Sequence, residues 1–151
     1  MTQQVSMNGG SEPHWSASGQ ELFYCDERGI LRSAKLQLGA SIKVLARDSL
    51  FPISPYTGGL RPSYRVHPDG KRVFVSNGGD ASVSVIDVAS NTITATIGVG
   101  QRPWNMALTP DGKKLYVACG RSGVVSVIDT ESNTKLSDIA VGKLPWGVVI
   151  R

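Results

Sequence analysis

Cationic and aromatic side chains recur beside proline at three places in the chain. The sequence contains Arg61-Pro62-Ser63-Tyr64, then Arg102-Pro103-Trp104, then Lys143-Leu144-Pro145-Trp146. A cation beside an aromatic ring can bind an anionic or planar ligand. The candidate ligand-binding residues are therefore Arg61, Tyr64, Arg102, Trp104, Lys143 and Trp146. The alternative is that the rings pack inside the protein and the cations are solvated.

The sequence offers no equally clear set of catalytic or metal-binding residues. It has only two histidines, His14 and His67, and His67 precedes a Pro-Asp-Gly turn, where we expect it to face solvent. No His-x-x-x-His, Cys-x-x-Cys or Gly-x-Ser-x-Gly motif occurs. We therefore expect no metal site and no catalytic residue.

Aspartates and cysteines have structural explanations. Asp69 and Asp111 lie in Pro-Asp-Gly turns, and Asp87 and Asp129 end strand-like runs ahead of Ser-Asn turns. In such turns the carboxylate commonly accepts hydrogen bonds from nearby backbone groups. The two cysteines are far apart in sequence and are expected to be buried.

A tandem repeat organises the second part of the chain. Residues 68–104 align with residues 110–146 at a constant offset of 42 and are identical at 19 of 37 positions. Each unit predicts four short strands; in the second unit these are 104–109, 114–118, 124–129 and 134–141. Four strands in about 42 residues is the size of a β-propeller blade. A β-sandwich is the alternative, but it gives no reason for a fixed period.

Residues 62–151 resemble the YVTN-type β-propeller repeat proteins. Within that group, the segments 99–104 and 141–151 are most similar to the propeller associated with PQQ-dependent catabolism. The chain departs from the usual YVTN spelling at 73–77 and 115–119, where the alternation of apolar residues is kept. Residues 11–46 resemble a TolB or tricorn blade, with Ala17-Ser18 where that family has Pro-Asp.

These patterns predict an all-β partial propeller of about three four-stranded blades with one stray strand at each end. Residues 1–10 would hold the outer strand of an incomplete blade, with residues 3–7 extended. Residues 11–47 would form the first blade, 48–61 a linker, 62–102 the second blade, 103–144 the third blade and 145–151 the inner strand of another incomplete blade. In the first blade, 29–36 and 41–46 would be the third and fourth strands.

An open row of blades leaves exposed edges, and known propellers close with four to eight blades. We therefore expect either missing blades or closure by a homo-oligomer, in which residues 3–7 of one copy join residues 146–151 of another. A compact irregular form is the third possibility.

Composition permits several functions and excludes others. Gly 17 and Pro 8 in 151 residues fit a turn-rich globular protein, and Cys 2 excludes a disulfide framework. The net charge of +4 is scattered, so it permits anionic partners without requiring them. The first eight residues show neither a basic nor an apolar region of a secretion signal, whereas the resemblance implies a periplasmic or exported protein.

The favoured function is a non-catalytic binding or scaffold module for a protein or small anionic ligand. The resemblance implies a role accessory to quinoprotein oxidation, with PQQ as an associated cofactor that the sequence does not show to be bound. An enzyme of the propeller lactonase or quinoprotein dehydrogenase-subunit type is the alternative. Nucleic-acid binding, which the Arg/Trp loops also permit, is the least favoured.

Overall fold

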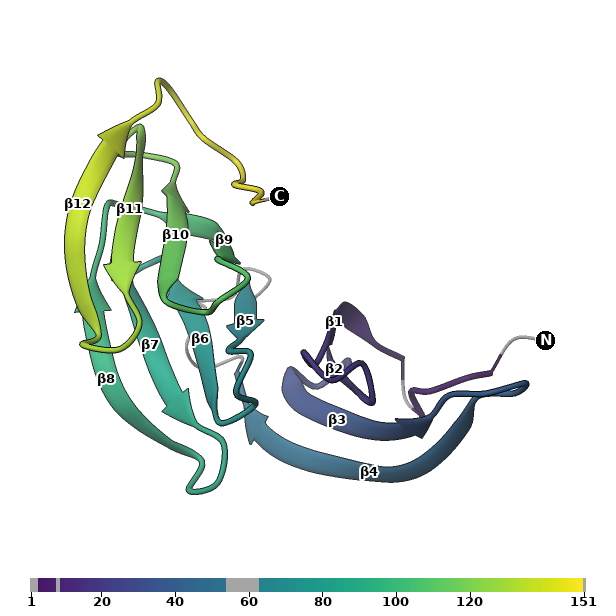
Figure 1. Cartoon of the computed structure of the whole chain (residues 1–151). Helices are drawn as coiled ribbons and strands as arrows, with labels where there is room; N and C mark the ends of the chain where they lie inside the picture. Colours follow the sequence, from purple (N-terminus) through teal and green to yellow (C-terminus); the bar gives the residue numbers. More distant parts are fainter. Residues whose placement is uncertain (1–2, 8, 54–62, 151) are drawn as a thin grey trace. The chain divides into compact units, whose positions relative to one another are not determined.

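Three four-stranded antiparallel sheets make up the computed structural model, which describes residues 3–7, 9–53 and 63–150 (Figure 1). The first sheet contains β1 (Ser11–Trp15), β2 (Glu21–Cys25), β3 (Ile30–Gln37) and β4 (Lys43–Pro52). The second contains β5 (Tyr64–Val66), β6 (Arg72–Asn77), β7 (Ser82–Asp87) and β8 (Thr92–Gly98). The third contains β9 (Pro103–Leu108), β10 (Lys114–Cys119), β11 (Val124–Asp129) and β12 (Thr134–Ala140).

Each sheet pairs its strands in chain order, as a propeller blade does. The all-β prediction with three four-stranded blades is therefore confirmed. The chain divides into two compact units, with the boundary between residues 54 and 55. Unit 1 holds the first sheet and unit 2 holds the other two. No helix in the described part of the chain is long and apolar enough to cross a membrane.

Unit 1 differs from the sequence-based expectation at both ends of its sheet. β4 runs to Pro52, because the long β3 offers it partners as far as the Ile30–Pro52 pair. The predicted fourth strand, 41–46, was thus too short, and the linker predicted at 48–61 begins later; residues 54–61 lie outside the described residues.

The stray strand expected at 3–7 does not form. Its Val5 packs on the cluster of Tyr24, Ala34 and Leu36, and its Val5 carbonyl accepts a hydrogen bond from Arg47 Nε at 2.8 Å. The segment is therefore fixed by packing and one side-chain bond, without the backbone ladder that defines a strand.

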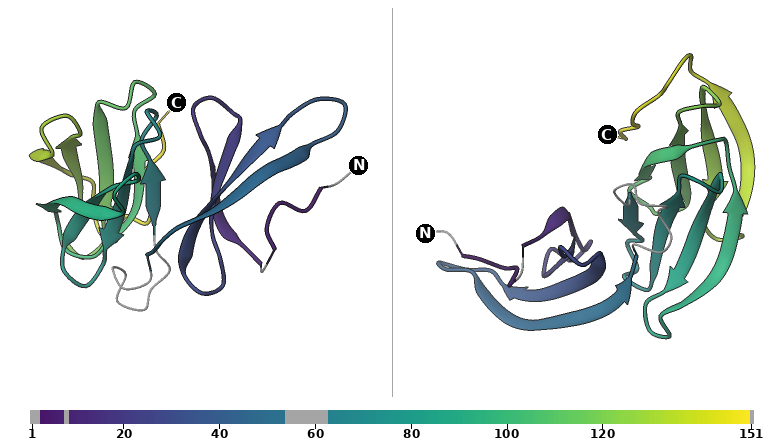
Figure 2. Two further views of the ribbon diagram at one scale, coloured as in Figure 1. Left: turned by 90° about the horizontal axis from the view of Figure 1, so that it is seen from below. Right: turned by 180° about the vertical axis from the view of Figure 1, so that it is seen from behind.

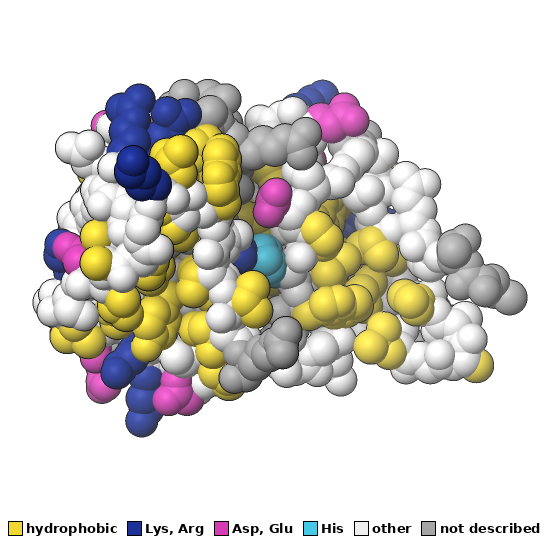
Figure 3. Space-filling view, turned by 90° about the horizontal axis from the view of Figure 1, so that it is seen from above, with side chains coloured by type: hydrophobic (Ala, Val, Ile, Leu, Met, Phe, Trp, Pro, Cys, Tyr) yellow, Lys and Arg dark blue, Asp and Glu magenta, His cyan; other side chains and the backbone are white. Residues whose placement is uncertain are grey.

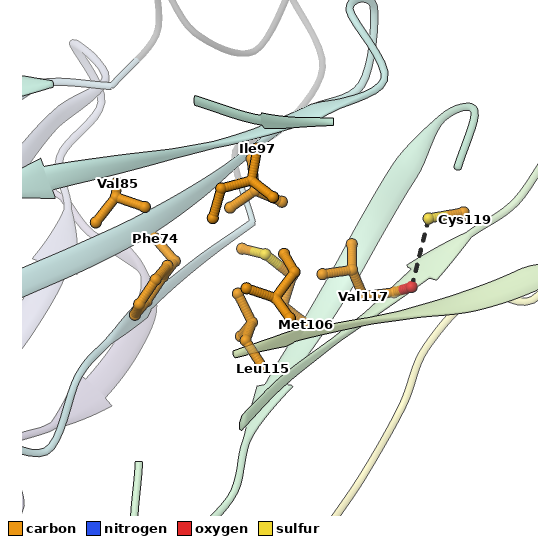
Figure 4. Close-up of a cluster of buried hydrophobic side chains, with 9 residues drawn as sticks. Phe74, Val85, Ile97, Met106, Leu115, Val117 and Cys119 are labelled. Carbon is orange, nitrogen blue, oxygen red and sulfur yellow. Dashed lines mark hydrogen bonds between the residues drawn. The ribbon is translucent and has the colours of Figure 1, made fainter. Parts of the chain in front are cut away.

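A shared hydrophobic core joins the two sheets of unit 2, which lie side by side in Figures 1 and 2. The sheet β5–β8 contributes Phe74, Val83, Val85 and Ile97, and the sheet β9–β12 contributes Met106, Leu115, Val117, Cys119 and Ile128. Figure 4 shows these two sets of side chains facing each other. All nine are at most 5% exposed, so the packing of one sheet on the other removes these apolar side chains from water.

The repeat places a matching set of side chains on the opposite face of the last sheet. At the offset of 42, Val83, Val85 and Ile97 correspond to Val125, Val127 and Ile139. The strand pairing is also equivalent, since Ile97 lies opposite Val83 and Ile139 lies opposite Val125. Exposure differs sharply, because Ile97 is 5% exposed and Ile139 is 46% exposed. The outer face of β9–β12 thus has the same residues as the packed face of β5–β8. At β12, the described residues leave this face exposed.

Truncating these two isoleucines should have very different effects. We expect Ile97→Ala to lower the free energy of unfolding by about 2–5 kcal/mol, because it opens a cavity in the shared core. In the single chain, at protein concentrations too low for association, Ile139→Ala should cost no more than about 0.5 kcal/mol, as surface changes do. Urea denaturation followed by circular dichroism measures both. Equal losses would show that the outer face is also packed in solution.

A group of polar residues joins the same two sheets at one end. His67 Nε2 lies 3.1 Å from the Gly112 carbonyl oxygen, and Arg72 donates to the Thr130 carbonyl at 2.5 Å. Thr130 in turn donates its hydroxyl to the Gly112 carbonyl. We call these residues, with Asp69, the inter-sheet hydrogen-bond group.

The expectation that His67 faces solvent was wrong, because its side chain is only 11% exposed and contacts the neighbouring sheet. Asp69 lies 2.9 Å from His67 Nδ1 and 3.3 Å from Arg72. Burial alone would raise the pKa of the Asp69 carboxyl, but the Lys71 N–H and the contacts with His67 and Arg72 lower it overall. The carboxylate therefore stays charged and holds both partners in position.

The C-terminal segment beyond β12 is extended but is not a strand in residues 145–150. The inner strand predicted at 145–151 therefore does not form within the described residues, where the segment builds no backbone ladder with a strand. It still lies beside β9: the Val148 N–H points at Asn105 Oδ1 at 3.5 Å, and the Trp146 ring packs on Trp104.

Candidate functional site

The loop that enters β9 and the segment that follows β12 meet at one end of unit 2. The loop carries Arg102 and Trp104, and the segment carries Lys143 and Trp146. Trp146 follows Trp104 by one repeat of 42 residues. The turn between β10 and β11, residues 120–123, lies between the loop and the segment and forms the floor of the site. Figure 3 looks onto this end of unit 2, where Lys and Arg side chains gather beside hydrophobic ones.

Backbone hydrogen bonds fix the first loop to this turn. The N–H groups of Gly120 and Arg121 donate to the carbonyls of Arg102 and Gln101 at 3.0 and 3.1 Å. The Gln101 N–H donates to the Ser122 hydroxyl at 2.6 Å. Arg102 is held at φ 59°, in the left-handed region that non-glycine residues seldom adopt. Such a conformation persists only where the surroundings enforce it, and these three bonds do so.

Arg102 and the two tryptophans form a stack. The guanidinium carbon of Arg102 lies 4.8 Å from the centre of the Trp104 ring, within the range of a cation–π interaction. The Trp104 and Trp146 rings are 5.1 Å apart between centroids, with their planes tilted by 42°. Trp146 is 68% exposed, so most of its ring remains open to a ligand.

Two adjoining cavities lie at this end of unit 2, and the stack lines the smaller one. The smaller, of 240 Å³, is lined by Arg102, Trp104, Gly120, Arg121, Leu144, Pro145 and Trp146. The larger, of 530 Å³, is lined by Gly120, Arg121, Ser122, Gly123, Ala140, Gly142, Lys143 and Leu144. The volume of the larger cavity falls within the range of about 300–1,000 Å³ that is typical of small-molecule sites.

The charges around these cavities are all positive. Arg102, Arg121 and Lys143 line them, and no carboxylate does. Within the described part of the chain, none of the three cations forms an ion pair. Arg102 Nε is buried and finds no hydrogen-bond partner among the described residues. Three uncompensated cations beside two indole rings favour an anion with a planar, apolar part.

The six predicted ligand-binding residues do not all lie at the cavities. Arg102, Trp104, Lys143 and Trp146 line the two cavities. Tyr64 does not: it is 0% exposed and pairs with Val75, just as the core residue Met106 pairs with Val117. At the repeat offset of 42, Tyr64 corresponds to Met106 and not to Trp104. Arg61 lies outside the described residues.

Arg121 is a lining residue of both cavities that the sequence analysis did not select. The recurrence of cations before inner strands could not reveal it, because it lies in the β10–β11 turn. The available signal was the repeat itself, in which Gly79 occupies the equivalent position. Arg121 is thus present in the second repeat only, in a turn next to the cavities, which indicates a role at this site and not in the fold of the repeat.

The remaining titratable side chains of the described residues have structural surroundings. The described residues contain no cluster of three or more His, Cys, Asp or Glu side chains that could hold a metal ion. Both cysteines are buried, and burial raises the pKa of the Cys25 and Cys119 thiols, which keeps them protonated and unreactive. The structural interpretation of the aspartates is supported: Asp87 and Asp129 accept hydrogen bonds from Ser90 and Ser132, which lower their pKa.

A family model for the YNCE-like beta-propeller matches residues 55–150. The chain belongs to this family. The match covers the whole described part of unit 2, including the entry loops and the tryptophan pair. The predicted resemblance to YVTN-type propellers is thereby confirmed at the level of the family. No curated protein matches the chain at a significant level.

Solved structures agree on the fold of this YNCE-like chain. Hydrazine synthase of Kuenenia stuttgartiensis is similar with a TM-score of 0.63 and 26% identity, over 89% of this chain and 37% of that one. The periplasmic gluconolactonase of Pseudomonas aeruginosa is similar with a TM-score of 0.55 and 22% identity, over 91% of this chain and 41% of that one. Apo AztD from Citrobacter koseri is similar with a TM-score of 0.64 and 18% identity, over 97% of this chain and 38% of that one. The YNCE-like chain thus spans about two fifths of the length of each of these proteins.

Replacing Gly120 should disturb the tryptophan stack specifically. A Cβ at Gly120 would lie 2.7 Å from Trp104 Nε1, so we expect Gly120→Ala to displace the Trp104 ring. The near-ultraviolet circular dichroism of the tryptophans should change while the far-ultraviolet spectrum stays the same. Gly79→Ala is the matched control, because its Cβ would meet nothing within 4 Å. An identical near-ultraviolet spectrum for Gly120→Ala and the unmodified chain would contradict the stacked geometry.

Proposed function

We propose that this chain is a non-catalytic ligand-binding module of the β-propeller type that takes a small anionic molecule at the stack of Arg102, Trp104 and Trp146. The observation that carries the proposal is the combination of three unpaired cations, two exposed or half-buried indoles and no lining carboxylate. The hydrogen bonds that fix the entry loop to the β10–β11 turn support it, since they pre-organise the site before binding.

We further propose that the ligand is a molecule that takes part in quinoprotein oxidation, and that the chain is an accessory protein of that process. This rests on the resemblance of segments 99–104 and 141–151 to the propeller associated with PQQ-dependent catabolism. PQQ is a planar aromatic tricarboxylate and has both features that the site favours. The proposal also carries the expectation of an exported or periplasmic location.

Titration with PQQ tests this function. We expect quenching of tryptophan fluorescence that saturates, and a loss of at least about tenfold in affinity for Arg102→Ala and for Trp104→Ala, since each removes one face of the stack. Lys113→Ala is the control, because Lys113 is exposed and lines neither cavity. Unchanged binding by the folded Arg102 and Trp104 variants would show that PQQ binds elsewhere, and no binding would remove the quinoprotein assignment.

A lactonase is the second candidate, because a periplasmic gluconolactonase and this chain share the fold. Against it stands the lining of the cavities, which contains no His, Asp or Glu that could act as a general base. A glucono-lactone added to the same preparation should hydrolyse only at the rate of the buffer. Faster hydrolysis would replace the binding proposal with the enzymatic one.

We also propose that a second copy of this chain covers the outer face of β9–β12. The repeat supports this: the equivalent face of β5–β8 is already buried by a sheet of the same kind. Two copies would contribute six sheets, which lies within the four to eight blades of closed propellers.

Light scattering behind a sizing column should therefore give the mass of a discrete oligomer. Ile139→Asp should reduce that mass to one chain, because it places a charge in the contact, whereas Lys135→Asp on the same strand should have little effect. A single-chain mass for the unmodified protein at all concentrations would contradict the interface.

A further inference from the structure

The two cavities at the entry loops are adjoining parts of one site. They share three lining residues, Gly120, Arg121 and Leu144. Arg121 is the only charged residue among the three. A molecule large enough to occupy both cavities would therefore pass beside the Arg121 side chain.

The two cavities differ in the chemistry of their walls. The smaller one has the Trp104 and Trp146 rings together with Leu144 and Pro145, so it favours a flat apolar group. The larger one has Lys143, Ser122 and a floor of glycines, so it favours a charged group that approaches the backbone closely. Arg121 stands at the junction and can contact either part of a ligand.

We propose that one ligand bridges the two cavities: a planar aromatic molecule that carries a carboxylate or phosphate group. Its ring stacks on Trp146 beside Trp104, and its anionic group binds Arg121 and Lys143. This inference rests on the binding function proposed above and deepens it by assigning a separate part of the ligand to each cavity.

The geometry of the stack explains why the ring binds at Trp146. Arg102 already lies over the Trp104 ring, 4.8 Å from its centre, and Trp104 is only half-buried. Trp146 is 68% exposed and its plane makes an angle of 42° with that of Trp104, so more of the Trp146 ring is open to a ligand. Arg121 and Lys143 remain for the anionic group, because Arg102 is engaged with the indole and its Nε is buried.

Four probes separate the contributions of the ring and the anion. These are 2-naphthyl phosphate, 2-naphthoate, 2-naphthol and inorganic phosphate, each titrated into the full chain at low salt by calorimetry. We expect one of the two naphthyl anions to bind at least about tenfold more tightly than 2-naphthol, because a charged hydrogen bond is gained. Inorganic phosphate should bind more weakly than 2-naphthyl phosphate. The tighter of the two naphthyl anions identifies the anionic group.

Two variants assign these contributions to residues. Arg121→Gln should lower the affinity for the tighter anion toward that of 2-naphthol, with Lys143 retaining part of the difference, and should leave 2-naphthol unchanged. Trp146→Ala should weaken all three aromatic probes at least about tenfold. Lys113→Gln, an exposed cation outside both cavities, is the matched control and should change nothing. Far-ultraviolet circular dichroism confirms that each variant is folded.

The possible failures are distinguishable. Equal binding of 2-naphthol and both anions, or unchanged binding by Arg121→Gln, would overturn the bridging ligand while leaving a binding site in place. Inorganic phosphate as tight as 2-naphthyl phosphate would overturn the role of the ring. If none of the four probes binds, the proposed binding function itself fails.

Discussion

The packing of one twisted sheet against the next is the interaction on which unit 2 depends. Each sheet is only four short strands, and such a sheet is not stable unless its apolar face is covered. Phe74, Val85 and Ile97 on one sheet and the side chains facing them on the other are almost completely buried. Strand pairing, turn geometry and the position of the entry loops all follow from this contact, because it fixes the spacing between successive repeats.

The position of the candidate site follows from that spacing between repeats. Since the repeat returns the chain to the same end of each sheet, the segments before successive inner strands lie close together. Trp104 and Trp146 are one repeat apart in sequence and 5.1 Å apart between ring centres. The turn 120–123 fills the space between the segments and hydrogen-bonds to the first of them. A rigid scaffold thus holds loops that are free to carry function, as in many β folds.

Periodicity in the sequence was sufficient to predict the fold, because a period of 42 with turn residues at fixed places specifies four strands and their order. It also aligned Trp104 with Trp146, whereas Arg102 and Lys143 align with Leu144 and Gln101 and were selected only as cations near these rings. It was not applied to Tyr64, which was selected because it follows Arg61-Pro62: the offset of 42 aligns Tyr64 with Met106 in the core and not with Trp104. His67 and Arg121 were missed for a different reason: their roles depend on a neighbouring sheet or loop that local sequence does not describe.

The inter-sheet hydrogen-bond group distinguishes one junction between repeats from another. The two repeats are identical at 19 of 37 positions, which would allow a sheet to dock on the wrong neighbour during folding. Yet the positions equivalent to Arg72 and Thr130 are Lys114 and Val88, which cannot reproduce the same set of bonds. Correct docking brings Arg72 to the Thr130 carbonyl and His67 to the Gly112 carbonyl, whereas a mismatched neighbour would leave the Arg72 guanidinium without this partner. These polar residues therefore give two nearly interchangeable sheets a fixed order of assembly.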